Sequence, residues 1–238
     1  MFDGLFHKRW FERGVLAILA VTAIVLVALA MVDQRIQAAG AERAAAAYKG
    51  PAVGTSPESK ITFAVVGDSV TASNSADIDS GDVGDGSWAY YANGGQAELV
   101  GGWALGGTTT ATMAQNVKHY DADVLVILAG TNDTGGGVPF SESTKNLESV
   151  VKRVGIKKVI VSSIPPRDDD PAVAVAYNTD LRALAAKQGW VFVDAMAKIR
   201  GSDNRYKSGY TSDGVHPTPA AAKLIGAAVL PIILDTAS

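Results

Sequence analysis

Three largely apolar runs of strand length constrain the fold of this chain more than any other feature. They are "ITFAVV" at 61–66, "VLVILA" at 124–129 and "VIVSSI" at 159–164. Continuous apolar runs are typical of strands that are buried on both faces, because a strand with one face in water alternates apolar and polar residues. Two weaker runs begin at Ala97 and Trp190, so we expect about five strands.

Helical patterns lie between these runs. Apolar residues recur at helical spacing over 147–154 and again over 177–184. Pro171 and Gly189 are typical start and stop signals of one helix, and Pro219 suits the first turn of the last helix. Because strands alternate with helices, we expect an α/β fold in which a parallel sheet is covered by helices on both faces. Sites in such sheets form just beyond the carboxyl ends of the strands.

The N-terminal region contains an apolar segment without charges, residues 14–32. Its nineteen residues would form about 28 Å of helix, which nearly matches the hydrocarbon core of a bilayer. Lys8, Arg9 and Arg13 precede the segment, and such an excess of positive charge is typical of the cytoplasmic side. We therefore expect an uncleaved signal-anchor helix, with the rest of the chain outside the cytoplasm.

The expected organisation has four parts. Residues 1–13 are cytoplasmic, 14–32 cross the membrane, 33–59 form a tether rich in Ala, Pro, Gly and Ser, and 60–238 form the exported domain. The alternative is cleavage near the small residues of "IQAAGA", which would release a secreted protein. The apolar run is longer than the roughly 7 to 15 residues of a signal peptide, which favours the anchor.

Composition and charge patterning exclude several functions. The formal net charge of −3 provides no basic surface, so we expect no nucleic-acid partner. The chain has no cysteine, which excludes disulfides, thiolate nucleophiles and cysteine-based metal sites. The acidic stretch 77–86 departs from the calcium-loop pattern at Gly81 and Asp82, and "RDDDP" at 167–171 is interpreted as a charged loop followed by a helix start. We expect neither a metal nor a cofactor.

A serine just beyond the first run is the candidate nucleophile. Ser69, in "GDSV", is either a turn residue or a nucleophile, and a nucleophilic serine needs a base. Of the three histidines, His7 precedes the membrane segment and His119 is expected on the surface. His216 has Asp213 three residues before it, where a carboxylate can fix the tautomer of the imidazole. Ser69, His216 and Asp213 are therefore the candidate catalytic set.

The turns after the next two strands offer hydrogen-bond donors. Gly107 has a backbone N–H that no side chain obstructs, and Asn132 has a side-chain amide. Together with the N–H of Ser69, these donors could stabilise a developing oxyanion. All three residues follow predicted strands, so we expect them at one edge of the sheet.

Four short sequence blocks resemble those of the SGNH hydrolases, also called GDSL esterases and lipases. They are "GDSV" at 67–70, "GGTTT" at 106–110, "GTND" at 130–133 and "DGVH" at 213–216. The resemblance extends over about 60–234, essentially the whole expected exported domain. It implies a three-layer α/β/α sandwich with a flavodoxin-like topology.

The resemblance also implies a role for each candidate residue. Ser69 would be the nucleophile, His216 its base and Asp213 the carboxylate that orients the base. Ser69, Gly107 and Asn132 would form the oxyanion hole. Gly106 is the alternative donor in the second block, although the two glycines before three threonines favour Gly107.

The resemblance implies a serine esterase that hydrolyses acyl esters through an acyl-enzyme on Ser69 and needs no cofactor. With the N-terminal anchor, the sequence predicts a membrane-anchored extracytoplasmic enzyme that acts on small-molecule, lipid or carbohydrate esters, such as acetyl esters of an envelope polymer. Two alternatives stay open, an acyltransferase that passes the acyl group to a sugar hydroxyl and a non-catalytic carbohydrate-binding module. Loops at 134–141 and 201–212 are expected to shape the substrate site.

Overall fold

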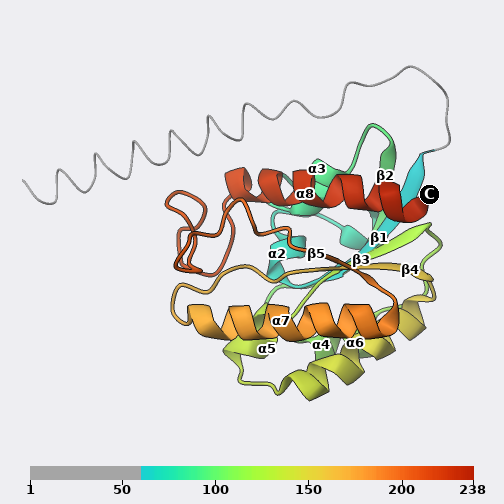
Figure 1. Cartoon of the computed structure of the whole chain (residues 1–238). Helices are drawn as coiled ribbons and strands as arrows, with labels where there is room; N and C mark the ends of the chain where they lie inside the picture. The colour runs from blue at the N-terminus through green and yellow to red at the C-terminus, as the bar shows by residue number, and fades with distance from the viewer. Residues whose placement is uncertain (1–59) are drawn as a thin grey trace, which may run out of the picture.

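Five parallel strands form one sheet in the order β2-β1-β3-β4-β5 in the computed structural model, which describes residues 60–238 (Figure 1). The strands are β1 (Ile61–Gly67), β2 (Ala97–Ala104), β3 (Val124–Leu128), β4 (Lys158–Ser162) and β5 (Val191–Val193). This order is that of flavodoxin-like folds, so the predicted five-stranded parallel sheet is confirmed. The predicted cytoplasmic segment (1–13), transmembrane helix (14–32) and tether (33–59) lie outside the described residues.

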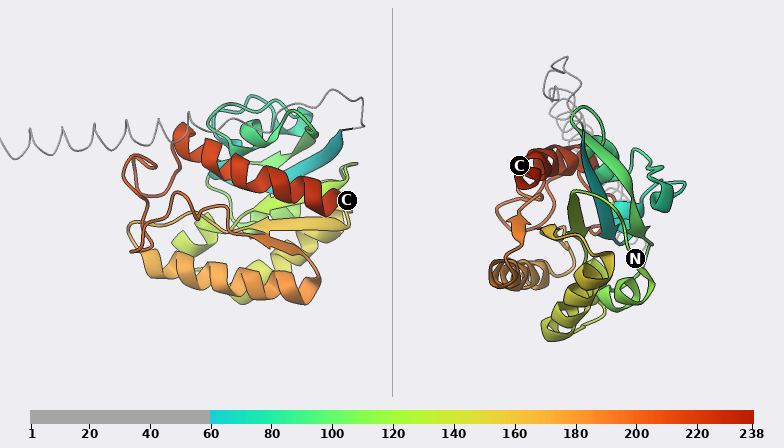
Figure 2. Two further views of the ribbon diagram at one scale, coloured as in Figure 1. Left: turned by 45° about the horizontal axis from the view of Figure 1, so that its top comes forward. Right: turned by 90° about the vertical axis from the view of Figure 1, so that its right-hand side faces the viewer.

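Helices cover both faces of the sheet. One face carries α3 (Trp88–Ala92) and α8 (Pro219–Ala237), and the other carries α4 (Thr110–Asn116), α6 (Phe140–Val154) and α7 (Pro171–Gln188). In the right-hand view of Figure 2, α8 and α7 lie on opposite sides of the strands. The described residues thus form the expected three-layer α/β/α sandwich. The shorter helices are α2 (Ser69–Ala72), the 3-10 helix η1 (Ile78–Ser80) and α5 (Thr131–Gly135).

The apolar runs are continuous because each central strand supplies two hydrophobic cores. Along β1, Phe63 and Val65 pack in the core beneath α8, whereas Ala64 and Val66 pack in the core beneath α4, α6 and α7. All four side chains are fully buried. Successive side chains of a strand point to opposite faces, so a strand covered on both sides needs apolar residues at every position.

The ends of the two long helices follow the predicted local signals. Pro171 occupies the first turn of α7, and the Asp170 side chain accepts a hydrogen bond from the N–H of Val173. Gly189 ends α7 in the left-handed conformation with φ of 70°, which a glycine adopts without steric cost. Thr218 caps α8 with its side chain.

Among residues 60–238, α8 alone is long and apolar enough to cross a membrane. Half of its apolar window is buried inside the structure, where Ile225, Val229 and Ile233 join the same core as Phe63 and Val65. The apolar composition of α8 is therefore explained by its packing on the sheet.

Candidate active site

The carboxyl edge of the sheet gathers the segments that carry the predicted site residues. Ser69 begins α2 directly after β1, the turn with Gly107 follows β2, and Asn132 lies in α5 after β3. Asp213 and His216 belong to the long connection between β5 and α8, which loops out at the left of Figure 1. This is the edge at which parallel α/β sheets form their sites.

Ser69, His216 and Asp213 form one chain of hydrogen bonds. The Ser69 Oγ lies 2.9 Å from the Nε2 of His216, and the Nδ1 of His216 lies 2.7 Å from the Oδ2 of Asp213. An ionised carboxylate can only accept, so Nδ1 donates to Asp213 and the neutral imidazole leaves Nε2 free to accept from the Ser69 hydroxyl. In this tautomer His216 can take a proton from Ser69.

The Asp213 carboxylate is held in place by the turn that it begins. Its Oδ1 accepts hydrogen bonds from the backbone N–H groups of Val215, at 2.9 Å, and His216, at 2.7 Å. Partial burial raises the pKa of Asp213, but these hydrogen bonds, the imidazole contact and the His216 charge outweigh it and hold the pKa well below its usual range. Asp213 therefore remains ionised at any pH at which His216 can act as a base.

The turn that carries Gly107 lies beside the serine and is bonded to Asn132. A Cβ atom on Gly106 would lie 3.7 Å from the Ser69 Cβ, which places this turn beside the nucleophile candidate. Gly107 adopts the left-handed conformation with φ of 77° and is exposed. Asn132 Nδ2 donates to the carbonyl of Thr108 at 2.9 Å, which ties the amide to the same turn and leaves its second N–H for a ligand.

Asp68, the residue before Ser69, is fully buried. Its Oδ1 accepts a hydrogen bond of 3.0 Å from the N–H of Val70 and caps α2, whereas its Oδ2 has no hydrogen-bond partner within residues 60–238. Burial raises the pKa of Asp68 to about 6, and the nearby Asp133 carboxylate adds to this effect, while the Val70 N–H acts against it. The nucleophile candidate is thus directly preceded by a carboxylate that is costly to ionise.

Asp133, the last residue of the "GTND" block, connects α5 to neighbouring helices by hydrogen bonds. Its carboxylate accepts hydrogen bonds from the N–H of Thr110 at 2.9 Å, the hydroxyl of Thr110 at 2.5 Å and the hydroxyl of Ser143 at 2.8 Å. Asp133 is fully buried, so these donors replace the water that a carboxylate otherwise requires. The short helix that carries Asn132 is therefore anchored to α4 and α6.

Two residues near the site were missed by the sequence interpretation. "RDDDP" was expected to be a charged loop before a helix, and Asp170 and Pro171 do begin α7. The structure also places Arg167 against α5 and Asp168 against the turn that contains His216. Their partners lie far away along the chain, so no local spacing in the sequence indicates these contacts.

The remaining histidine of the described residues, His119, is exposed, as expected. Its Nδ1 lies 2.9 Å from the carbonyl of Val154 at the end of α6. The acidic stretch 77–86 also makes structural contacts. Asp79 forms an ion pair of 2.6 Å with Lys118 and accepts a hydrogen bond of 2.8 Å from the Tyr120 hydroxyl.

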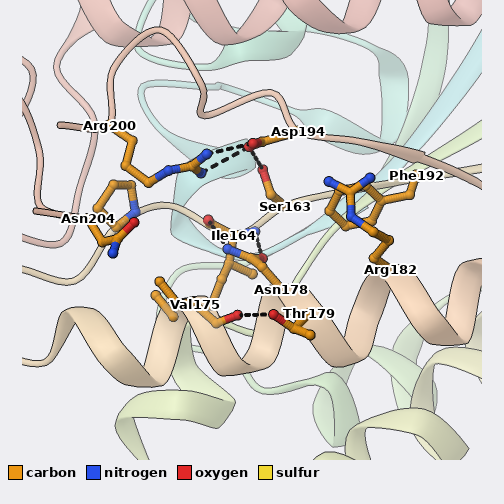
Figure 3. A pocket seen from close by; sticks show the side chains of 12 residues that line it. Ser163, Ile164, Val175, Asn178, Thr179, Arg182, Phe192, Asp194, Arg200 and Asn204 are labelled. Atoms are coloured by element: carbon orange, nitrogen blue, oxygen red, sulfur yellow. Dashed lines mark hydrogen bonds and ion pairs between the residues drawn. The ribbon is translucent and has the colours of Figure 1, made fainter. Parts of the chain in front are cut away.

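A cavity of about 180 Å³ lies where β4 and β5 end beside α7 (Figure 3). Its main charged groups pair with each other, since Arg200 Nη1 and Nη2 donate to Asp194 at 3.0 and 2.6 Å. The Asn178 amide binds both backbone groups of Ile164. None of the predicted site residues lines this cavity.

An α/β/α sandwich whose carboxyl edge carries a hydrogen-bonded serine, histidine and aspartate is typical of a class of acylhydrolases. The model of the GDSL-like lipase/acylhydrolase family matches residues 65–224, more than half of the chain, and the chain belongs to this family. The predicted family is therefore confirmed. No curated protein matches the sequence.

Solved structures of low sequence identity share the fold. A lipolytic protein of the G-D-S-L family from Desulfitobacterium hafniense is 17% identical, with a TM-score of 0.60, over 73% of this chain and 99% of that one. An acetylxylan esterase from Geobacillus stearothermophilus is 19% identical, with a TM-score of 0.56, over 74% and 95%. A GDSL-like lipase from Bacteroides thetaiotaomicron is 21% identical, with a TM-score of 0.54, over 82% and 95%.

Proposed function

We propose that this chain is a membrane-anchored, extracytoplasmic serine esterase that hydrolyses acyl esters through an acyl-enzyme on Ser69. The observation that carries the proposal is the contact of 2.9 Å between Ser69 Oγ and His216 Nε2, with His216 Nδ1 fixed on Asp213 at 2.7 Å. A serine hydroxyl becomes an effective nucleophile only when a base takes its proton, and this arrangement provides an oriented base.

Acylation would begin at the Ser69 hydroxyl. As its oxygen attacks the ester carbonyl carbon, His216 Nε2 takes the proton, and Asp213 stabilises the resulting imidazolium. The carbonyl oxygen becomes an oxyanion that accepts hydrogen bonds from the N–H groups of Ser69 and Gly107 and from Asn132 Nδ2. When the carbon–oxygen bond to the leaving group breaks, His216 returns the proton to the departing alkoxide and an alcohol leaves.

Deacylation would repeat the sequence with water. His216 takes a proton from a water molecule, whose oxygen attacks the acyl carbon and forms a second tetrahedral intermediate on the same donors. The bond to Ser69 then breaks, the proton on His216 passes to Ser69 Oγ, and a carboxylic acid leaves. The proton that Ser69 gave to the leaving alcohol is replaced by one from water, so the enzyme is regenerated.

The openness of the site favours a short acyl group on a large alcohol. The side chains of His216 and Asp213 are 48% and 50% exposed, and Leu105, Gly106 and Gly107 are exposed as well. An acetyl group on a carbohydrate can reach such a site without a deep acyl pocket. The likeness of the fold to an acetylxylan esterase supports the same choice. We therefore propose carbohydrate acetyl esters as the substrate class. Lipid esters are the alternative class that the assay below distinguishes.

The apolar segment at 14–32 supports the proposed location. Its length and the preceding positive charges support a cytoplasmic N-terminus and a folded domain outside the cytoplasm. Esters of an envelope polymer would then be within reach of a tethered enzyme.

A covalent probe tests the proposed chemistry. The purified full chain is incubated with a fluorophosphonate, which phosphonylates only an activated serine, and is assayed with p-nitrophenyl esters of increasing chain length and with an acetylated oligosaccharide. We expect labelling at Ser69, fastest turnover on acetate, and loss of both in Ser69→Ala. Replacement of the exposed Ser238, at the end of α8 that is far from His216, by alanine is the matched control and should change neither. Labelling that survives Ser69→Ala would refute the proposal. A preference for long acyl chains would refute carbohydrate acetyl esters as the substrate class and indicate lipid esters.

A further inference from the structure

Two adjacent residues of the connection between β4 and α7 contact the two turns that hold the proposed chemistry. Arg167 reaches α5, which carries Asn132, and Asp168 reaches the turn that carries His216. Neither residue touches Ser69, and neither has a role in the mechanism above. The function of this pair therefore has to be found in the geometry of its contacts.

Arg167 lies along the short helix α5. Its Nη1 donates to the carbonyl of Thr131 at 3.2 Å, and a Cβ atom on Gly135 would lie 2.9 Å from the same nitrogen. Thr131 and Gly135 are the first and last residues of α5, so one guanidinium contacts both ends of the helix. The Arg167 side chain is only 13% exposed, and its Nη2 is paired with Asp169 at 2.8 Å. This second contact fixes the plane of the guanidinium.

Asp168 fixes the other turn through both its backbone and its side chain. Its N–H donates to the carbonyl of Gly214 at 2.9 Å, and its Oδ1 accepts the N–H of Tyr206 at 2.8 Å. The hydroxyl of Tyr206 in turn donates to the carbonyl of Val215 at 2.8 Å. Gly214 and Val215 are the two residues between Asp213 and His216. Asp168 therefore holds this turn directly and also through a buried tyrosine.

We propose that Arg167 and Asp168, the Arg167–Asp168 brace, are positioning residues that hold Asn132 and His216 at the separation that the reaction needs. Since α5 has only five residues and the His216 turn is largely exposed, neither segment is fixed by a long element of its own. Displacement of a donor or a base by about 1 Å costs up to roughly 100-fold in rate. The inference rests on the proposed esterase function and adds two residues that act without touching substrate.

The Arg167 half is tested by a double-mutant cycle on the full chain. We expect Arg167→Met, which keeps the length of the apolar stem, to lower kcat for p-nitrophenyl acetate roughly tenfold and to leave KM within about twofold. In the Asn132→Ala background the same change should lower kcat by less than about twofold, because Arg167 acts through Asn132. An equal loss in both backgrounds, or no loss in the wild type, would overturn this half of the proposal.

The control for this cycle is Arg182→Met. Arg182 is an exposed arginine whose guanidinium lies 4.1 Å from the centre of the Phe192 ring, away from both turns. It should change kcat by less than about twofold in either background. If Arg167→Met does not yield folded protein, Arg167→Lys carries the same comparison, since lysine keeps the charge and cannot span both Thr131 and Asp169.

The Asp168 half is tested by comparing two replacements. Asp168→Ala removes the acceptor for the Tyr206 N–H and should lower kcat roughly fivefold to tenfold. Asp168→Asn keeps an oxygen at the position of Oδ1 and should restore kcat to within about twofold of the wild type. If asparagine fails as alanine does, the charge of Asp168 and not its hydrogen bond matters, and the brace is refuted. Ester turnover and Ser69 labelling of the wild type test the proposed function separately from these ratios.

Discussion

Replacement of Asp68 by asparagine should stabilise the folded chain at neutral and alkaline pH. Asp68 is fully buried, and its Oδ2 has no hydrogen-bond partner within residues 60–238. Asparagine retains an oxygen that can accept the N–H of Val70, which Asp68 binds at 3.0 Å, so the cap of α2 is preserved. The substitution removes the charge, and with it the repulsion between Asp68 and the buried Asp133.

The magnitude follows from the pKa of Asp68. Burial raises this pKa from 3.8 to about 6, and because each pKa unit corresponds to about 1.4 kcal/mol, ionised Asp68 costs the folded state about 3 kcal/mol. The folded state binds the proton more tightly than the unfolded state, so this carboxyl stabilises the fold below pH 3.8 and loses that effect as the pH rises through 6. We therefore expect Asp68→Asn to gain about 3 kcal/mol at pH 8 and about 0.5 kcal/mol at pH 4.

Urea unfolding of the full chain, followed by tryptophan fluorescence between pH 4 and 8, measures this difference. Asp121→Asn, at an exposed position, is the matched control and should show no such pH-dependent gain. A gain that is the same at pH 4 and pH 8 would contradict the argument, because only the ionised form of Asp68 carries the penalty. Loss of stability at pH 8 would show that the Asp68 charge has a partner that stabilises it.

Three further predictions concern the oxyanion donor, a crowded glycine and the orientation in the membrane. Asn132→Ala should lower kcat in an ester hydrolysis assay roughly 10² to 10³-fold, which is the usual loss for one oxyanion donor. The melting temperature should change little, and an unchanged kcat would remove Asn132 from the site. Gly130→Ala should destabilise the chain by about 2 kcal/mol or more in thermal unfolding, because its φ is 124° and a Cβ atom there would collide with the Tyr177 ring. Gly137→Ala, also at positive φ but with no neighbour within 4 Å among residues 60–238, should cost only about 1 kcal/mol, and equal losses would refute the steric argument. A reporter that works only outside the cytoplasm should be active when fused after Ser59 and inactive when fused before Gly14, and the reverse result would refute the proposed orientation.

The sequence predicted the sheet because its strands are buried on both faces. The run 124–129 has no polar residue and the run 61–66 has only Thr62, and this pattern leaves few alternatives to a parallel sheet covered by helices. The ends of α7 were predictable as well, since Pro171 and Gly189 act through local backbone conformation. These features depend on neighbouring residues, so a single sequence contains them.

The site was predictable where its residues follow strands or, as for Asp213 and His216, lie at a short spacing along the chain. Ser69 and Asn132 come directly after β1 and β3, so the rule for parallel sheets placed them at one edge. The contacts of Arg167 and Asp168 depend on how a connecting loop crosses the finished fold, and the burial of Asp68 depends on what packs over α2. Such contacts join residues that are distant along the chain, and no spacing within the sequence encodes them.

Ser69 and His216 should act as one unit in ester hydrolysis. The measurement is kcat for p-nitrophenyl acetate in Ser69→Ala, His216→Ala and the double variant of the full chain. We expect each single change to lower kcat by roughly 10⁴-fold or more, and the double variant to lie within about threefold of either, because residues that act in one step are not additive. Near-normal turnover in Ser69→Ala, or two losses that multiply in the double variant, would contradict the account.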